Sequence, residues 1–366
     1  MAKEPATGKK STASSSPALR TELARLDREL LKLLNQRAKK ALEVSKHASD
    51  DPAPADDIET HLAELVGHNR GPLSADCVRA VFLELCSGSR ALHRQTRVAF
   101  LGPAYSYSHV ATLERFGSSV EMVPVGSIGA VFEEVNRGHA EFGVVPVENS
   151  TDGRVADTLD MFTRLRVRIC GEVQLRIHHN LLARCPRSDV SEVYSRPQAL
   201  SQCRNWLVRH LPAARTIEVT STSTAAQLAQ DKPGAAAIAS VQAGVHYGLD
   251  VLAENIEDNQ GNVTRFAVIG EESAGRTGHD KMATMFEVEH RPGALADSMN
   301  VFKRNRLNLT WIESFPISRP AGGYLFFVEL DGHETDTRVR KALAALEKKT
   351  LRLEILGSYP RSEAVG

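Results

Sequence analysis

The residues of this chain best suited to chemistry lie in the segment Asn262-Val263-Thr264-Arg265-Phe266. A threonine hydroxyl can donate or accept a proton within hydrogen-bond reach, and an adjacent guanidinium can hold a carboxylate through two parallel hydrogen bonds. The segment leads directly into residues 267–270, an apolar run typical of a strand. The pattern predicts a site for a small anionic substrate, with Thr264 and Arg265 at its centre.

Polar side chains also follow several apolar, strand-like stretches in the middle of the chain. These polar segments are residues 105–109, 148–150, 195–198 and 222–224. Each holds hydroxyl or amide groups that can cap the helix expected after it, which is a purely structural role. In α/β folds, however, ligands bind where loops leave the carboxyl ends of the strands. We therefore expect these segments to converge with Thr264 on a pocket that binds oxygen atoms.

The composition excludes several classes of partner. Apolar residues make up 42% and charged residues 25%, and Lys plus Arg equal Asp plus Glu at 45 each, so the net charge is +0. Such a chain has no electrostatic footprint for nucleic acid, and no apolar run reaches the roughly 20 residues of a membrane span. Residues 1–17 are small and polar, which predicts a disordered tail and no secretory signal. We expect a cytoplasmic protein with neither nucleic acid nor membrane as a partner.

The sequence also gives no sign of a metal or a nucleotide. The five cysteines are odd in number and lack metal-type spacing, which favours reduced structural thiols. The 13 histidines are scattered, and His178 and His179 are assigned to a strand, where neighbouring side chains point to opposite faces. Neither a P-loop nor a Rossmann glycine pattern is present.

Three helices without strands are predicted at the start of the chain. Leucines recur at three- and four-residue steps over residues 19–46, a second helix covers 57–67, and a third covers 74–92. Ser74 and Asp76 suit the cap and the first turn of the third helix. Three helices bury little apolar surface alone, so we expect them to pair with a second copy of the chain.

From residue 97 onward, β-type runs alternate with helical stretches, which predicts an α/β domain with a largely parallel sheet. Strands are expected at residues 97–103, 120–125, 142–147, 167–177, 190–194, 216–220, 236–238 and 266–269. Helices are expected at residues 108–116, 127–137, 198–210 and 223–230.

A smaller unit is predicted after a charged, glycine-rich linker at residues 271–280. Its strands are expected at residues 284–289, 309–316, 324–330 and 351–358, and its helices at residues 294–304 and 336–348. The resulting β-α-β-β-α-β order is the ferredoxin-like pattern.

The central region resembles prephenate dehydratase through motifs that occur in the family order and spacing. They are Phe-Leu-Gly-Pro at 100–103, Val-Val-Pro-Val-Glu-Asn-Ser at 144–150, Tyr-Ser-x-Pro-Gln-Ala-Leu at 194–200 and Thr-Arg-Phe at 264–266. Residues 284–361 resemble the ACT regulatory domain attached to that enzyme. Residues 19–93 resemble the all-helical chorismate mutase that is fused to it in the bifunctional P-proteins, so the whole chain is similar to a P-protein.

The resemblance implies a multidomain α+β chain. Its parts would be a tail at 1–17, a chorismate-mutase-like helical domain at 18–95, a prephenate dehydratase domain at 96–272 and a ferredoxin-like ACT domain at 281–362. The family fold of the dehydratase part is two α/β lobes with a cleft between them, similar to periplasmic binding proteins.

The chemistry that the resemblance implies is the loss of carbon dioxide and the ring hydroxyl from prephenate, which gives phenylpyruvate. Hydroxide is a poor leaving group, so an acid must protonate it as the bond breaks. By resemblance Thr264 is that donor, next to Phe266 of the same motif, and Arg265 neutralises a substrate carboxylate. Aromatisation drives the reaction, so no cofactor is expected.

Other residues receive binding roles by the same resemblance. Those that orient the ring hydroxyl and the second carboxylate are Glu148, Asn149 and Ser150. Those expected to contact the substrate elsewhere are Ser106, Ser108, Ser195, Gln198, Thr222 and Ser223. Those expected to bind phenylalanine as an allosteric effector are Gly293, Ala294, Leu295, Asn308, Leu309, Glu313 and Ser314.

Some positions depart from the family pattern. Tyr105 replaces the usual glycine of the first loop and Arg196 replaces the usual histidine of the third motif, but neither change removes a proposed catalytic group. Phe315 replaces the arginine of the regulatory Glu-Ser-Arg-Pro motif, which would weaken or retune the response to phenylalanine.

The mutase part departs further. The positions that match the family are Arg20, Arg37, Asp57 and Ser89, whereas the family's lysine, arginine, glutamate and glutamine fall on Ala48, Thr60, His61 and His93. The mutase substrate is a dianion, and each charge-assisted hydrogen bond contributes ~1.5–3 kcal/mol, so losing two cations is severe. Lys46 can substitute only if the helix register shifts. We expect mutase activity to be absent or very weak and the helices to serve dimerisation.

Three alternatives to a monofunctional prephenate dehydratase stay open. The chain could be fully bifunctional, it could act on arogenate, or it could be a non-catalytic amino-acid sensor. Retention of the Thr-Arg-Phe and Glu-Asn-Ser motifs favours an enzyme over a sensor, because a sensor needs the cleft but no proton donor. A homo-oligomer, either a dimer or a tetramer, is expected through helix pairing and contacts between ACT domains.

Overall fold

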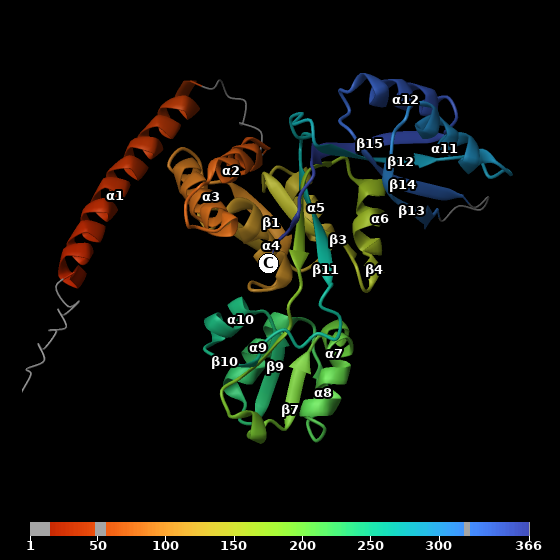
Figure 1. The fold of residues 1–366 in the computed structure, drawn as a ribbon. Coiled ribbons are helices and arrows are strands. Elements are labelled where there is room, and N and C mark those ends of the chain that lie inside the picture. The colour runs from red at the N-terminus through yellow and green to blue at the C-terminus, as the bar shows by residue number, and fades with distance from the viewer. Residues whose placement is uncertain (1–14, 48–55, 318–322, 366) are drawn as a thin grey trace, which may run out of the picture.

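The computed structural model describes residues 15–47, 56–317 and 323–365. The predicted tail therefore lies outside the described residues except at its end, where the first helix already begins at Ser15. Figure 1 shows a long N-terminal helix, an upper and a lower lobe, and a smaller unit beside the upper lobe. Among the helices described, none combines the length and the apolar character needed to cross a membrane.

The predicted N-terminal helices are present as α1 (Ser15–His47), α2 (Asp56–His68) and α3 (Ala75–Ala91). Ser74 caps α3 as expected, because its side chain accepts a hydrogen bond from the backbone N–H of Cys77. A small cluster around Leu62 and Leu83 joins α2 to α3. Helix α1 contacts α3. Several of its leucines are nevertheless exposed, between 48% for Leu26 and 62% for Leu19.

The upper lobe is built on a mixed sheet with the strand order β16-β5-β11-β3-β1-β2, to which β4 adds beside β3. Its strands are β1 (Arg97–Leu101), β2 (Glu121–Val125), β3 (Phe142–Asn149), β4 (Gly153–Arg154), β5 (Arg168–Arg176), β11 (Val263–Gly270) and β16 (Ala364–Val365). Its helices are α4 (Tyr107–Phe116), α5 (Ile128–Asn136) and α6 (Ala156–Arg164).

The expectation of a largely parallel sheet is wrong for this lobe. Strand β11 runs antiparallel to both of its neighbours, β3 and β5. The reason is topological. The chain returns to β11 from the lower lobe, so β11 begins at the end of the sheet where β3 finishes. The beginning of β11 therefore lies beside the end of β3.

The lower lobe has a second sheet with the order β10-β6-β9-β7-β8. Its strands are β6 (Asn180–Ala183), β7 (Glu192–Ser195), β8 (Arg215–Glu218), β9 (Ala235–Ala239) and β10 (Asp250–Ala253). Its helices are α7 (Pro197–Gln202), α8 (Arg204–His210), α9 (Thr222–Asp231) and α10 (Val241–Tyr247), with a 3-10 turn at Arg187–Asp189. The single helix expected at 198–210 is thus two helices, separated at Cys203.

The chain crosses between the lobes twice, at residues 177–179 and 254–262. His178 and His179 lie in the first crossing and not in a strand, contrary to the expectation. Here the chain leaves the upper sheet after β5 and joins the lower sheet only at Asn180, so its polar groups are satisfied by side chains at the crossing. His178 Nδ1 lies 2.9 Å from Glu257 Oε1, and the backbone N–H of His179 donates to Glu257 Oε2 at 2.8 Å.

The C-terminal unit has the predicted ferredoxin-like order of elements. They are β12 (Asp280–Glu287), α11 (Ala294–Arg304), β13 (Leu309–Pro316), β14 (Tyr324–Asp331), α12 (Thr337–Glu347) and β15 (Arg352–Pro360). Their strand order is β13-β14-β12-β15, with every pairing antiparallel.

This unit docks tightly on the upper lobe. One apolar cluster contains Phe162 and Ile169 from the lobe together with Met285 and Phe327 from the unit. Gly357 of β15 has φ 151°, and a Cβ there would lie 2.1 Å from the carbonyl oxygen of Ile169 on β5. Only a glycine allows this approach of two backbones, so the unit and the lobe share one interior.

Candidate active site

A cleft of about 1000 Å³ lies between the upper and lower lobes. Thr264, Asn149 and Phe266 line it from the upper lobe, and Arg196 and Thr222 line it from the lower lobe. The upper residues come from β11 and the end of β3, whereas the lower ones lie at the starts of α7 and α9. The cleft is thus bounded by loops and strand ends, as the sequence predicts.

Thr264 is held by the side-chain amide of Asn149. The two residues are register partners across β11 and β3, and Asn149 Nδ2 donates to Thr264 Oγ1 at 2.8 Å. The second Nδ2 proton goes to Asn262 Oδ1 at 2.8 Å. Because Thr264 Oγ1 accepts in this contact, its own proton is not used there and can be donated into the cleft.

The amide of Asn149 is fully occupied by protein groups. Its Oδ1 accepts from the backbone N–H groups of Thr151 at 2.9 Å and Asp152 at 3.0 Å. With both donors also in use, its orientation is fixed and it has no group left for a substrate. Asn149 therefore acts through Thr264 and does not itself orient the ring hydroxyl, which differs from the expectation.

Polar contacts across the crossings join the two lobes behind Thr264. Gln202 Oε1, at the end of α7, accepts from Asn262 Nδ2 at 3.0 Å and lies 2.8 Å from His179 Nε2. His179 Nδ1 lies 2.9 Å from the hydroxyl of Tyr107. Burial lowers the pKa of His179, while its hydrogen bond to Gln202 opposes the shift, so the ring is neutral. Local sequence gives no signal for this network, because its members come from distant segments.

Glu148 and Ser150 do not line the cleft. Ser150 Oγ accepts from the backbone N–H of Val263 at 3.0 Å and donates to the carbonyl of Gly261 at 3.2 Å. It therefore fixes the entry of the chain into β11. Glu148 Oε2 lies 3.4 Å from Arg265 Nη2, on the far side of the strand from Thr264. Neither residue is placed to orient a substrate, although both had been expected to do so.

The placement of Arg265 does not fit its expected role. Successive residues of a strand point to opposite faces, so Arg265 points away from the cleft that Thr264 faces. Its Nη1 lies 2.5 Å from Glu329 Oε1 on β14, and its guanidinium lies 5.1 Å from the ring centroid of Trp311 on β13. Only 12% of the Arg265 side chain and 5% of the Glu329 side chain are exposed. Burial would lower the pKa of Arg265, but Glu329 and its neighbours raise it, so the cation is permanent and committed to the C-terminal unit.

Two other arginines line the cleft. Arg196 precedes α7 and is exposed, and its guanidinium has no hydrogen-bond or ion-pair partner among the residues described. Arg154 on β4 also lines the cleft, but its Nη1 donates to Glu313 Oε2 at 2.7 Å and to the carbonyl of Ser314 at 3.1 Å. The available cation for a substrate carboxylate is therefore Arg196, whereas the sequence had marked this position only as a departure from its family.

The expected substrate contacts divide into two groups. Ser106, Ser108, Gln198 and Thr222 line the cleft. Ser195 and Ser223 do not: both are fully buried, and their hydroxyls donate to the carbonyls of Ile238 and Ala104, each at 2.7 Å. These two hydroxyls satisfy backbone acceptors inside the fold, so they do not serve the substrate. Ser221 and Thr224 line the cleft instead.

Tyr105 joins the lobes at the rim of the cleft. It has φ 64°, which explains why glycine is the usual residue here. Its ring stacks on His246 of α10 with a centroid separation of 3.7 Å. The contact ties the first loop of the upper lobe to the lower lobe.

The expected regulatory residues lie in two places on the C-terminal unit. Gly293, Ala294 and Leu295 stand at the beginning of α11, where Gly293 has φ 82°. Glu313 and Ser314 lie on β13, and Asn308 precedes this strand and donates to Asp331 at 2.9 Å. Strand β13 is at the edge of its sheet.

Among the described residues, the structure brings together two members of the expected mutase set, Arg37 and Ser89. Arg37 of α1 donates to Ser89 Oγ at 3.4 Å and to Cys86 Sγ at 3.1 Å, so these residues are brought together. Arg20 is exposed near the start of α1. The side chain of Asp57 and the whole of Ala48 lie outside the described residues.

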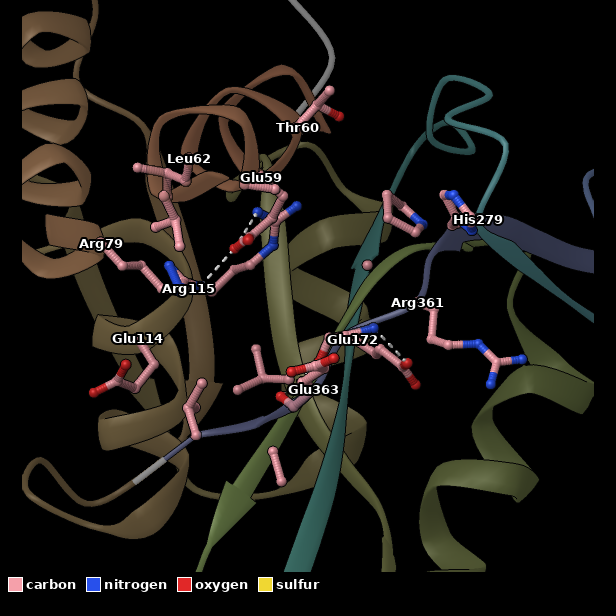
Figure 2. A pocket seen from close by; sticks show the side chains of 18 of the residues that line it. Glu59, Thr60, Leu62, Arg79, Glu114, Arg115, Glu172, His279, Arg361 and Glu363 are labelled. Atoms are coloured by element: carbon pink, nitrogen blue, oxygen red, sulfur yellow. Dashed lines mark hydrogen bonds and ion pairs between the residues drawn. The ribbon is translucent and has the colours of Figure 1, made fainter. Parts of the chain in front are cut away.

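A second hollow of about 470 Å³, seen in Figure 2, separates the N-terminal helices from the upper lobe. Several of its charged side chains form ion pairs with neighbouring residues. Glu59 Oε1 accepts from Arg79 at 2.8 Å and lies 3.4 Å from Arg115, and both oxygens of Glu172 bind Lys281 at 2.8 and 2.9 Å. This hollow is therefore a junction between domains. Among the residues described, there is also no group of His, Cys, Asp and Glu that could hold a metal.

Comparisons with known proteins show the family of the chain. Residues 98–274 match the family described as prephenate dehydratase, and residues 19–94 match the family described as chorismate mutase type II. A bifunctional chorismate mutase/prephenate dehydratase of Aquifex aeolicus strain VF5 is 40% identical, covering 94% of this chain and 97% of that protein. One of Stutzerimonas stutzeri is 38% identical, covering 96% and 99%.

Among solved structures, the prephenate dehydratase of Arthrobacter aurescens in complex with L-Phe is similar with a TM-score of 0.67. It is 34% identical, and the similarity covers 73% of this chain and 90% of that chain.

The pairing of Arg265 with Glu329 predicts a structural effect of its removal. In Arg265→Met, Glu329 stays buried without its cation, which costs about 3–5 kcal/mol of the free energy of unfolding. Urea unfolding should show this loss, and the double variant Arg265→Met/Glu329→Gln should recover most of it. Arg196→Met is the matched control and should unfold like the parent. Equal stability of Arg265→Met and the parent would contradict the assignment.

Proposed function

The chain belongs to the family of bifunctional chorismate mutase/prephenate dehydratases, and we propose that Thr264 is the proton donor of its dehydratase reaction. The protein is a prephenate dehydratase, and its N-terminal helices are chorismate-mutase-like. The observation that carries the proposal is the hydrogen bond in which Thr264 Oγ1 accepts from the fixed amide of Asn149. The proton of this hydroxyl is thereby left for the leaving group.

In the proposed reaction, the ring carboxylate leaves as carbon dioxide and its bonding electrons complete the aromatic ring. The bond from the ring to the hydroxyl oxygen breaks at the same time, and the proton of Thr264 converts the departing hydroxide into water. The resulting threonine alkoxide accepts a hydrogen bond from Asn149 Nδ2 and regains a proton from solvent. A free threonine is a weak acid, so the fixed amide of Asn149 must stabilise the negative charge as it develops on Thr264 Oγ1.

Arg196 is the proposed ligand of one substrate carboxylate. It extends from the lower lobe into the cleft without a protein partner in the described part of the chain, whereas Arg265 is committed to Glu329. Phe266 is buried beside Thr264 and supplies an apolar wall, and Ser106, Ser108, Gln198 and Thr222 supply further polar contacts. A guanidinium binds a carboxylate through two hydrogen bonds, which also sets the orientation of the substrate.

The C-terminal unit is proposed to be an ACT regulatory domain that binds phenylalanine. Its ferredoxin-like strand order and the similarity to a dehydratase crystallised with L-Phe support the proposal. The ligand residues would be those at the start of α11 and on β13. Phe315 packs edge-on against Phe327 at 6.3 Å, so the departure at this position contributes to the interior and offers no cation to the effector.

A dimer or a larger homo-oligomer is proposed through α1. The exposed leucines of this helix follow one another at helical spacing and include Leu23 at 59% and Leu30 at 55% exposure. A second copy is the partner that can cover this apolar stripe, because the long helix otherwise exposes it to water.

Thr264→Ala should remove the proton donor while the fold stays intact. Loss of a general acid lowers the rate ~10²- to 10⁴-fold, and Thr264→Ser, which keeps a hydroxyl, should retain part of it. Phenylpyruvate formation from prephenate gives kcat, and urea unfolding verifies the fold. If Thr264→Ala turned over near the parent rate, Thr264 would not be the donor. If the protein turned over arogenate in place of prephenate, the substrate would differ, but Thr264 would still be the proposed proton donor.

Chorismate should disappear slowly or not at all in the presence of the same protein. The site for its two carboxylates lacks the cations that Thr60 and Ala48 replace, and Arg37 is occupied by Ser89 and Cys86. The assay follows chorismate and prephenate in parallel, and Arg37→Ala controls for a contaminating mutase. Chorismate loss as fast as prephenate turnover, and abolished in Arg37→Ala, would mean that the mutase site is intact.

A further inference from the structure

Prephenate has two carboxylates, so the cleft must bind a substrate with two negative charges. Arg154 and Arg196 are the only arginine or lysine residues among the described residues that line it, and the acidic side chains of Asp152 and Asp157 line it as well. Arg196 alone leaves one carboxylate of prephenate without a cation. Arg265, which the sequence offers for this purpose, faces the C-terminal unit. Arg154 is therefore the candidate for the second cation.

Arg154 is close to the proton donor through the backbone. It belongs to β4, which pairs with the end of β3. In this pairing Arg154 lies opposite Glu148, and Gly153 lies opposite Asn149. The side chain of this same Asn149 holds Thr264. Strand β4 and the hydroxyl of Thr264 are therefore linked through one residue, Asn149.

The guanidinium of Arg154 is also bound outside the cleft. Its Nη1 contacts Glu313 Oε2 at 2.7 Å and the carbonyl of Ser314 at 3.1 Å, both on β13 of the C-terminal unit. The side chains of Arg154 and Glu313 are 39% and 27% exposed. Ion pairs that are open to water contribute little to stability, so this one can exchange partners readily.

We infer that Arg154 is shared between the substrate and the regulatory unit: bound to Glu313 it is withheld from the cleft, and released it binds the second substrate carboxylate. The inference rests on the proposed function in one respect, since Glu313 and Ser314 are expected to contact phenylalanine. An effector that engages Glu313 or shifts β13 changes the availability of Arg154. Affinity for prephenate and occupancy of the regulatory unit are thus coupled through one side chain.

The experiment measures kcat and KM for prephenate in the parent, Arg154→Ala, Arg154→Lys and Glu313→Gln. A lost charge-assisted contact should raise KM ~10- to 100-fold in Arg154→Ala, with a smaller effect on kcat. Lysine should restore part of the affinity, and Glu313→Gln, which frees Arg154, should lower KM. Arg164→Ala is the matched control, because Arg164 pairs with Asp160 on the same helix and does not line the cleft. A KM for Arg154→Ala equal to that of the parent would overturn the inference.

The coupling is tested with phenylalanine on the same proteins. Calorimetry gives its binding, and the change in KM that it causes gives its effect on the cleft. Arg154→Ala should still bind phenylalanine, but phenylalanine should no longer change its KM for prephenate. An undiminished change in KM would refute the shared role. A parent that does not bind phenylalanine would refute the ACT proposal and the regulatory half of the inference, while the KM of Arg154→Ala would still decide the cleft half.

Discussion

Side chains alternate between the two faces of β11, and both the cleft and the contact with the C-terminal unit depend on this alternation. Thr264 faces the cleft, and Arg265, the next residue, faces the C-terminal unit. The strand runs antiparallel to β3, so Thr264 lies beside Asn149 and the donor is held at the edge where β3 ends. A single strand thereby carries the chemistry on one face and the contact with another domain on the opposite face. A shift by one residue would exchange these two side chains and remove both functions.

The buried charges at the contact give this strand a defined position. Arg265 on β11 pairs with Glu329, which also accepts from Tyr359 at 3.0 Å, and Lys281 of β12 binds both oxygens of Glu172 on β5. Each pair joins the upper lobe to the C-terminal unit. A buried charge left without its partner is costly, so the two parts cannot separate without breaking these pairs. Movement of the C-terminal unit must therefore either carry β11 with it or be confined to exposed contacts such as that between Arg154 and Glu313.

Local patterns in the sequence predict much of the fold. The helical spacing of leucines locates α1, the side chain of Ser74 caps α3, and the order of elements in the C-terminal unit follows from their runs of apolar residues. The polar segments after strands do meet at one cleft, because strand ends gather at the same edge of each sheet. What local sequence cannot supply is the direction of β11, since that depends on the return of the chain through the entire lower lobe.

The errors at the site have the same origin. The face of Arg265 is decided by which residue of the strand meets a neighbouring domain, and the sequence contains no local sign of Glu329 as its partner. Ser195 and Ser223 have the residue type expected of a binding hydroxyl, but burial directs them to carbonyls of the fold. Arg154 lies in a strand of two residues, too short for a periodic signal. In each case a contact between distant segments determines the role of the side chain.

The measurement that tests the central claim most directly is a crystal structure of the protein with a stable, unreactive analogue of prephenate in the cleft. If β11 divides chemistry from domain contact, the oxygen that replaces the leaving hydroxyl lies within hydrogen-bond distance of Thr264 Oγ1. A carboxylate of the analogue then lies on Arg196, while Arg265 stays on Glu329. A carboxylate bound by Arg265, with Glu329 released, would contradict the account.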